Sequence, residues 1–198
     1  MCSSIIDWLR SKQSAWLGVV APLWGLFSVL IAAWLSPWFN WKTNAISDMG
    51  VYSSGQVAAF VLNSGLVIAG SLTILFIIGL WSKIADHWLE RGGTIVMGLT
   101  GLSLVGIGVV PENFGWIHFL VSVMFFMLAP VGMWFFAGRF LQEHARKQFG
   151  MVALLLSLVT VVAWNLPWDG IAIPEYLPAL ADSGWVILLS WSIIKGKF

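Results

Sequence analysis

The sequence has few charged residues and almost no cysteine. Asp, Glu, Lys and Arg make up 10% of its 198 residues, whereas hydrophobic residues make up 59%. Soluble domains average about 25% charged residues, so this balance indicates a protein whose main solvent is a lipid bilayer. The single cysteine, Cys2, excludes an internal disulfide and any multi-cysteine metal site. The net charge of +1, without a run of basic residues, gives no support to nucleic acid as a partner.

What the sequence does have is a series of long apolar stretches, which predict six membrane-spanning helices. A helix needs about 20 mainly apolar residues to cross the hydrocarbon core of a bilayer. Each span is expected to be an α-helix, because backbone groups exposed to lipid must satisfy their own hydrogen bonds. We therefore expect an all-α membrane protein, with residues 1–198 in a single domain. The six predicted spans lie near 15–36, 54–82, 92–111, 115–138, 148–168 and 176–195.

The sixth predicted span contains an acidic residue, Asp182, which limits where its helix can begin. A helix that started after Asp182 would cover only about 18 Å before Lys195, at 1.5 Å per residue, and could not cross the membrane. The helix is therefore expected to begin near Pro174 or Pro178, so that Asp182 lies at least one turn inside it.

Basic residues are distributed unevenly between the two sides of the predicted membrane. With six spans both termini lie on one side, and the positive-inside rule assigns the side rich in Lys and Arg to the cytoplasm. Only Lys42 falls on the opposite side. We therefore predict a multi-pass protein of the plasma membrane with cytoplasmic termini. The basic residues on the side of the termini are Arg10, Lys12, Lys83, Arg91, Arg139, Arg146, Lys147, Lys195 and Lys197.

The acidic residues fall into two groups. Those among the basic residues of the predicted cytoplasmic side are expected to belong to solvated loop faces: Asp7, Asp86, Glu90 and Glu143. Ionisable groups in or near the membrane are candidates for function, because their burial in lipid is costly. The acids predicted to be external, or just below the external surface, are Asp48, Glu112, Asp169, Glu175 and Asp182.

The external segment after the first span, "NAISDMG", predicts a short polar helical turn. Asn44, Ser47 and Asp48 stand at i, i+3 and i+4, so one helical turn would present them on a single face. A capping box of Ser53 and Gln56 is expected to begin the second span. The alternative for Asp48 is a purely structural one, in which its carboxylate caps or tethers the loop.

The segment between the third and fourth spans, "VVPENFGWIH", predicts a tight turn at the membrane interface. Glu112 and Asn113 lie in this turn, and His118 lies in the first turn of the next helix. The positive end of the helix dipole disfavours a charged imidazole there, so His118 is expected to be neutral. A neutral imidazole can act as a base or as a metal ligand. The alternative is that His118 only holds the turn in place through a hydrogen bond.

Together, "SPWFNWKTNAISDMG" and "GVVPENFGWIH" resemble the prokaryotic six-span membrane family known as domain of unknown function 998. Its pattern is an Ile-Ser-Asp-Leu-Gly-like motif, then a Pro-Glu-Asn/Asp-like motif and a nearby His; Met49 replaces the usual Leu. The resemblance covers nearly the whole chain and implies six spans, but no activity. The Ile-Ser-Asp element is also similar to one in eukaryotic DRAM-type six-span proteins, some relatives of which are linked to lipid remodelling. The positions that match the family motifs are Ser47, Asp48, Pro111, Glu112 and His118.

These residues predict a site on the external side that recognises or processes a lipid or lipid-linked head group. As an enzyme, the protein would use Asp48, Glu112 and His118 for catalysis, with a divalent metal ion as a candidate cofactor. A non-catalytic accessory or structural subunit of a membrane complex is the alternative, and small-solute or proton transport ranks lower. Membrane lipids and other membrane subunits are the expected partners. The residues expected to bind the substrate are Asn44, Ser47, Asn113 and Asp182.

Overall fold

The computed structural model describes residues 7–84 and 86–196, and its regular structure there is entirely helical. Six of the helices in this described part are long and apolar enough to cross a membrane, which confirms the predicted all-α six-span fold. Of the short 3-10 helices in the described part, η1 (Lys12–Trp16) comes before the long helices, and η2 (Ser47–Gly50), η3 (Glu112–Phe114) and η4 (His144–Arg146) lie between them. The six long helices are α2 (Leu17–Trp34), α3 (Gln56–Trp81), α4 (Trp88–Val109), α5 (Trp116–Phe140), α6 (Lys147–Asn165) and α7 (Ala172–Ile194).

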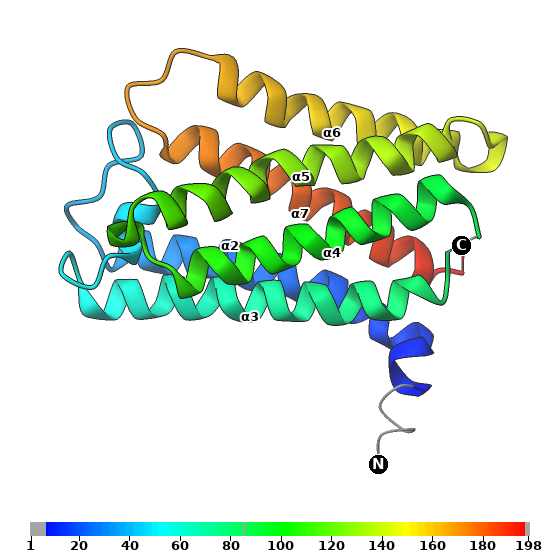
Figure 1. Ribbon diagram of the computed structural model, residues 1–198, viewed down its shortest axis with the longest axis horizontal. Coiled ribbons are helices and arrows are strands. Elements are labelled where there is room, and N and C mark those ends of the chain that lie inside the picture. The colour runs from blue at the N-terminus through cyan, green and yellow to red at the C-terminus, as the bar shows by residue number, and fades with distance from the viewer. Residues whose placement is uncertain (1–6, 85, 197–198) are drawn as a thin grey trace.

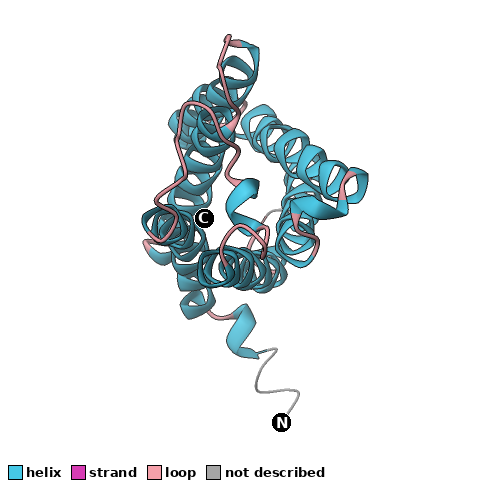
Figure 2. Cartoon of the chain, turned by 90° about the vertical axis from the view of Figure 1, so that its left-hand side faces the viewer, coloured by secondary structure: helices cyan, strands magenta, loops and turns pink. Residues whose placement is uncertain are grey.

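The six long helices pack in chain order into a ring (Figure 1). Each helix packs against the next one along the chain, and α7 closes the ring by packing against α2. We call the end with η1 and the last turn of α7 the terminal end. The opposite end carries the connections 35–55, 110–115 and 166–171, and we call it the loop end. Figure 2 looks onto the loop end and shows η2 inside the ring.

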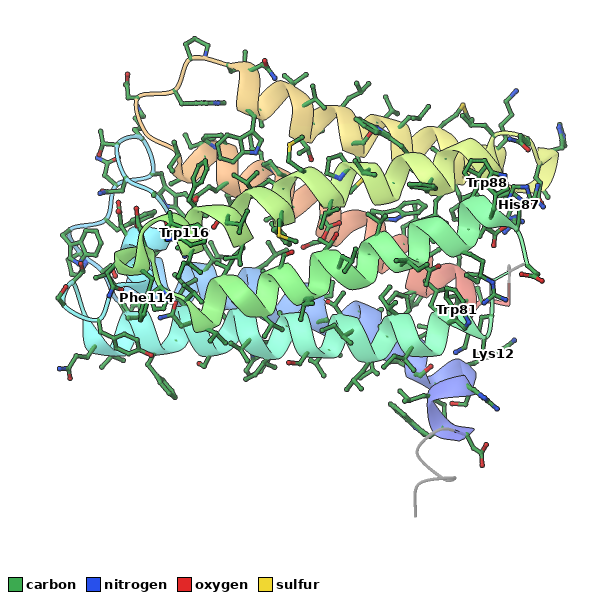
Figure 3. All side chains as sticks on the ribbon, viewed as in Figure 1. Lys12, Trp81, His87, Trp88, Phe114 and Trp116 are labelled. Atoms are coloured by element: carbon green, nitrogen blue, oxygen red, sulfur yellow. The ribbon has the colours of Figure 1, made fainter. Side chains whose placement is uncertain are left out.

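Exposed aromatic side chains mark both ends of the bundle (Figure 3). Trp81 and Trp88 lie at the terminal end and are 43% and 70% exposed. Trp116 lies at the loop end and is 72% exposed. Tryptophan prefers the boundary between water and hydrocarbon, so these side chains agree with a bilayer that covers the length of the helices between the two ends.

Glycines allow α3 and α4 to approach each other backbone to backbone. A Cβ atom at Gly70 would lie 2.6 Å from the Gly101 carbonyl oxygen, and one at Gly108 would lie 2.5 Å from the Asn63 carbonyl oxygen. Both distances are far below ordinary contact distances. Small residues permit such packing where no hydrophobic force drives helices together, and it holds Asn63 close to the loop end of α4.

The interior of the ring is filled differently at its two ends. Toward the terminal end it is closed by a packed aromatic cluster in which Phe136 and Trp185 have ring centroids 5.8 Å apart and Phe140 contacts both. Toward the loop end a smaller cluster forms around Met49 and Leu62. The pocket described below lies beside that cluster, in the half of the bundle nearer the loop end.

Glu90 is completely buried, which shows that the expectation of a solvated loop face was wrong for this residue. Its Oε1 atom lies 3.0 Å from Nη2 of Arg146 and 3.4 Å from Nε of Arg139, and both arginines also pair with Glu143. Arg139 lies at the end of α5 and Arg146 lies in η4, so these ion pairs join the first turn of α4 to both segments. A buried charge persists when opposite charges and hydrogen bonds surround it.

The bounds of two helices differ in detail from what the sequence patterns indicate. The helix α3 begins at Gln56 with Gly55 at its cap position and no side-chain hydrogen bond, so the expected capping box with Ser53 was wrong. The helix α7 begins at Ala172, before Pro174, and Asp182 therefore lies well inside it.

Candidate functional site

The loop after α2 folds back into the mouth of the ring and places η2 there. Met49 is fully buried and packs with Val29, Ala32 and Leu62 of the surrounding helices. Because Met49 points inward, the polar residues of the same turn face the loops and the neighbouring helices instead. The apolar anchor thus fixes which side chains of "NAISDMG" reach the interior.

Asn44 lies before η2, so the expected single helical turn of Asn44, Ser47 and Asp48 was wrong, but Asn44 and Asp48 are in contact. Oδ2 of Asp48 accepts hydrogen bonds from Nδ2 of Asn44 at 3.0 Å and from the backbone N–H of Ala45 at 2.9 Å. The Asn63 amide of α3 donates to the carbonyl oxygen of Gly50 at 2.8 Å. Asp48 therefore stabilises the turn, and Asn63 ties the turn to α3.

Glu175, in the first turn of α7, fixes the other side of the loop. Its side chain is only 9% exposed, and Oε2 accepts a hydrogen bond of 2.6 Å from the backbone N–H of Ile46. The carbonyl oxygen of Asn44 accepts hydrogen bonds from the N–H groups of Ile171 and Ala172. The start of α7 and the loop that carries η2 are thus held as one unit.

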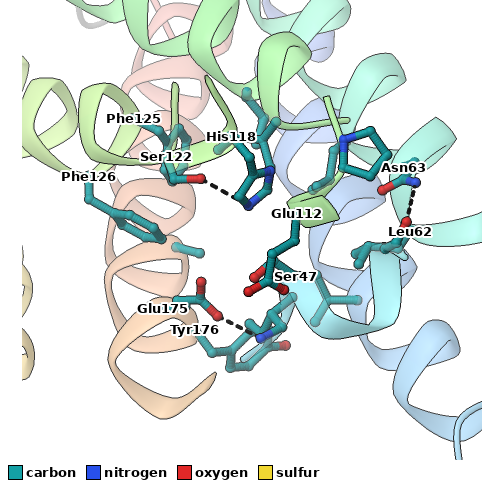
Figure 4. Close-up of a pocket in the computed structure, with 18 residues that line it drawn as sticks. Ser47, Leu62, Asn63, Glu112, His118, Ser122, Phe125, Phe126, Glu175 and Tyr176 are labelled. Atoms are coloured by element: carbon teal, nitrogen blue, oxygen red, sulfur yellow. Dashed lines mark hydrogen bonds between the residues drawn. The ribbon is translucent and has the colours of Figure 1, made fainter. Parts of the chain in front are cut away.

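His118 is buried, and its hydrogen bonds define its tautomer. Nδ1 lies 2.6 Å from the carbonyl oxygen of Val110, which can only accept, so Nδ1 carries the proton. In a neutral imidazole Nε2 then has a free lone pair, and the Ser122 hydroxyl lies 3.3 Å from it. Figure 4 shows Nε2 on the side of the ring that faces Glu112. His118 therefore both holds the turn and offers an acceptor to the pocket.

Glu112 lies in η3, directly before the sharp turn into α5. Gly115 adopts φ 60° there, a conformation that favours glycine, and this lets α5 start at once. Oε2 of Glu112 is buried and has no hydrogen-bond partner. Burial, and next the nearby Asp48 carboxylate, raise the pKa of Glu112 above its ordinary value, while a hydrogen bond with Ser47 opposes the shift.

These side chains surround a small pocket with a cavity volume of about 80 Å³ (Figure 4). Apolar residues make up most of its wall, and no Lys or Arg lines it. The polar side chains of the wall are Ser47, Asn63, Glu112, His118, Ser122 and Glu175. The apolar and aromatic ones are Val29, Ile46, Leu62, Leu66, Leu104, Ile107, Pro111, Phe125, Phe126, Tyr176 and Ala179.

The structure brings some of the predicted site residues together and leaves others apart. Ser47, Glu112 and His118 line the pocket; Asp48 does not line it, but its carboxylate lies within hydrogen-bonding reach of Glu112, and Asn44 contacts Asp48 within the loop. Asn113 lines a separate surface hollow beside Tyr52, Ser53 and Phe114.

Asp182 does not line the pocket either. Together with Glu175 and Ala179 it stands at i, i+4 and i+7 of α7, so the three share a face and Asp182 lies about 10 Å deeper than Glu175. No hydrogen bond or ion pair joins Asp182 to another of the described residues.

Sequence reasoning did not assign Glu175, Ser122 or Asn63 to the site. Glu175 was recognised as an external acid, and its position in the first turn of a helix that follows a long loop was the available signal. Ser122 lies four residues after His118, the spacing at which side chains on a helix are neighbours. No local signal links Asn63 to Gly50, because that contact joins α3 to a loop.

A metal ion has no ready-made ligand set here. Among residues 7–84 and 86–196, no three His, Cys, Asp or Glu side chains lie close enough together to hold one. We therefore assign no residue a role as a metal ligand.

The ring of six long apolar helices defines the class of the protein as a multi-pass membrane protein. The chain belongs to the family described as "Protein of unknown function (DUF998)", whose pattern matches residues 19–192. This confirms the resemblance drawn from the two loop motifs. No curated protein and no solved structure matches the chain, so the similarity to DRAM-type proteins stays a prediction.

Proposed function

We propose that the protein recognises a membrane amphiphile, a lipid or a lipid-linked molecule, with its polar head among Ser47, Glu112 and His118. The observation that carries the proposal is the division of one pocket into a polar mouth and an apolar interior. Leu66, Leu104 and Phe125 lie one to two helical turns deeper than the polar residues and would contact the apolar chain. Ligand pockets commonly combine an apolar wall with a few placed polar groups.

Selection among amphiphiles would depend on the head. An acyl chain that moves from lipid into an apolar pocket exchanges one apolar environment for another and gains little. A polar head that enters the mouth exchanges water for hydrogen bonds with fixed partners, and a mismatch leaves buried groups unpaired. The pocket would therefore accept amphiphiles with many different acyl chains but with only a few kinds of polar head group.

We infer further that the pocket opens toward the external leaflet of the plasma membrane. The basic residues of the described part are concentrated at the terminal end, and Lys42 alone lies at the loop end. The positive-inside rule then assigns the terminal end, with both termini, to the cytoplasm.

A structural role is the second candidate, and the hydrogen bonds of the loop favour it. Asp48 ties Asn44 and Ala45 to η2, and Glu175 ties Ile46 to α7, without any ligand. In that case the pocket residues would serve only to pin the loop end together, as in an accessory subunit of a membrane complex.

Filling the pocket separates the two candidates. Ala179→Phe places a ring into the pocket, whereas Leu180→Phe changes the neighbouring, 41% exposed position. Mass spectrometry of lipids that remain with the protein through purification should find a species enriched in the wild type and in Leu180→Phe. Ala179→Phe should lose it and still fold.

The loop contacts give a second readout. Asp48→Asn weakens the two hydrogen bonds that Oδ2 accepts, so we expect a lower melting temperature and little change in the identity of the bound lipid. If no species is enriched over the bulk lipid in any variant, the binding proposal is wrong and the structural role stands.

A further inference from the structure

We propose that the amphiphile recognised by this pocket carries a cationic head, a primary or secondary alkylammonium, and not a phosphate. The inference rests on the proposed function, since it names the head of the ligand that the pocket would bind. Three observations carry it: the charges around the pocket, the hydrogen-bonding groups that face its interior, and the aromatic rings of its wall.

The charges around the pocket are of one sign. Glu112 and Glu175 line it and Asp48 lies directly behind, close enough for each of the two glutamates to respond to its charge. Lys42 is the single basic residue at the loop end of the described part, and it is exposed and forms no ion pair. Proteins bind phosphate mainly with Arg and Lys. Neither lines this pocket among the described residues, so a phosphate would meet two glutamates without a compensating cation.

Two groups that face the pocket lack a full set of partners, and both are hydrogen-bond acceptors. Oε2 of Glu112 is buried with no donor, and Nε2 of His118 has a lone pair with only the long contact to Ser122. One of the two N–H donors of the Asn63 amide is already used by the carbonyl oxygen of Gly50. A primary alkylammonium has three N–H donors, a secondary one has two, and neither has an acceptor, so both complement these two acceptors.

The aromatic residues of the wall favour the same ligand. Phe125, Phe126 and Tyr176 line the pocket together with the carboxylates. The face of an aromatic ring attracts a cation, most strongly where water is excluded. A cation that reaches Glu112 would therefore be stabilised on its apolar side as well as on its polar side.

Three probes with the same chain and different heads test the proposal. Dodecylamine, dodecanol and dodecyl phosphate are titrated into the full-length protein in nanodiscs of phosphatidylcholine, and empty nanodiscs correct for partition into the lipid. We expect dodecylamine to bind at least about tenfold more tightly than dodecanol, as one desolvated charge pair provides, and dodecyl phosphate to bind most weakly.

A matched pair of variants locates the effect. Glu112→Gln removes the charge of a carboxylate whose Oε2 has no protein donor, and Asp169→Asn removes an exposed charge at the same end of the bundle, outside the pocket. We expect Glu112→Gln to weaken dodecylamine binding by about tenfold and thereby to remove most of its advantage over dodecanol. Asp169→Asn should change neither.

The two proposals fail in different ways. If all three probes bind with equal affinity and Ala179→Phe abolishes binding, the pocket binds amphiphiles without regard to the charge of the head. The proposal of a cationic head would then be wrong, while the proposed function would stand. The same holds if dodecyl phosphate binds best. If no probe binds above partition, or if Ala179→Phe changes nothing, the proposed function fails as well.

Discussion

Glu112 and Asp48 differ in how much of their hydrogen-bonding capacity the protein itself uses. Asp48 accepts two hydrogen bonds from its own loop, so most of its role is accounted for by the fold of η2. Glu112 keeps a buried oxygen without a donor. A buried acceptor without a partner is destabilising, which is why Glu112, and not Asp48, is the better candidate for contact with a ligand.

The raised pKa of Glu112 predicts how stability depends on pH. Burial and the Asp48 carboxylate raise this pKa in the folded protein above the ordinary value of 4.5, so the folded state binds the proton more tightly than the unfolded state does. Between the two pKa values the folded state holds more protons, and stability therefore falls as the pH rises through this window. Glu112→Gln cannot ionise and should lack this part of the pH dependence.

The measurement is a series of melting temperatures from pH 4 to pH 8 for both proteins in the same detergent, without added amphiphile. We expect Glu112→Gln to gain stability over the wild type as the pH rises. A constant difference across this range would show that the charge of Glu112 costs nothing in the folded state.

At the scale of elements, the approach of α3 and α4 predicts an asymmetry between two glycines of one helix. Gly108→Ala would place a Cβ 2.5 Å from the Asn63 carbonyl oxygen, whereas Gly98→Ala would meet only Cγ2 of Ile77 at 3.4 Å. Overpacking costs about 1–3 kcal/mol, while alanine gains up to about 1 kcal/mol over glycine within a helix. Gly108→Ala should therefore lower the melting temperature, and Gly98→Ala should keep or raise it.

Overpacking at Gly108 should also change the pocket. A shift of α4 away from Asn63 moves Leu104 and Ile107, which line the pocket, so Gly108→Ala should also reduce retention of the bound amphiphile. Equal melting temperatures for the two variants would mean that α3 and α4 separate at no cost.

The helices could be predicted from the sequence because hydropathy is a local property. The contact between Asn44 and Asp48 could be predicted for a similar reason, since the residues are only four apart in the sequence. The bond between Ile46 and Glu175 joins residues 129 positions apart, and no local pattern encodes it. The burial of Glu90 was missed for the same reason, because its arginine partners lie on α5 and η4. The sequence therefore indicates which residues are polar near the loop end, and the closure of the ring decides which of them meet.

At the scale of the whole molecule, the two ends of the bundle have different chemistry. The terminal end is rich in basic residues and is closed by the aromatic cluster and the buried ion pairs around Glu90. The loop end is acidic and holds the pocket. Because the interior is packed at the terminal end, the orientation of the protein decides which side of the membrane lies nearer to the pocket.

Thiol labelling in intact cells tests that orientation. In a Cys2→Ser background, Asp169→Cys places a thiol at an exposed position of the loop end, and Gln142→Cys places one at an exposed position of the terminal end. With cytoplasmic termini, a membrane-impermeant maleimide should label Asp169→Cys in intact cells and Gln142→Cys only after the membrane is permeabilised. Unfolding with detergent should label both, which controls for the reactivity of each thiol. The reverse labelling pattern would mean that the loop end, with the pocket, faces the cytoplasm. The ligand would then have to come from the inner leaflet, because the interior of the bundle is packed shut at the terminal end and gives no passage to the other side.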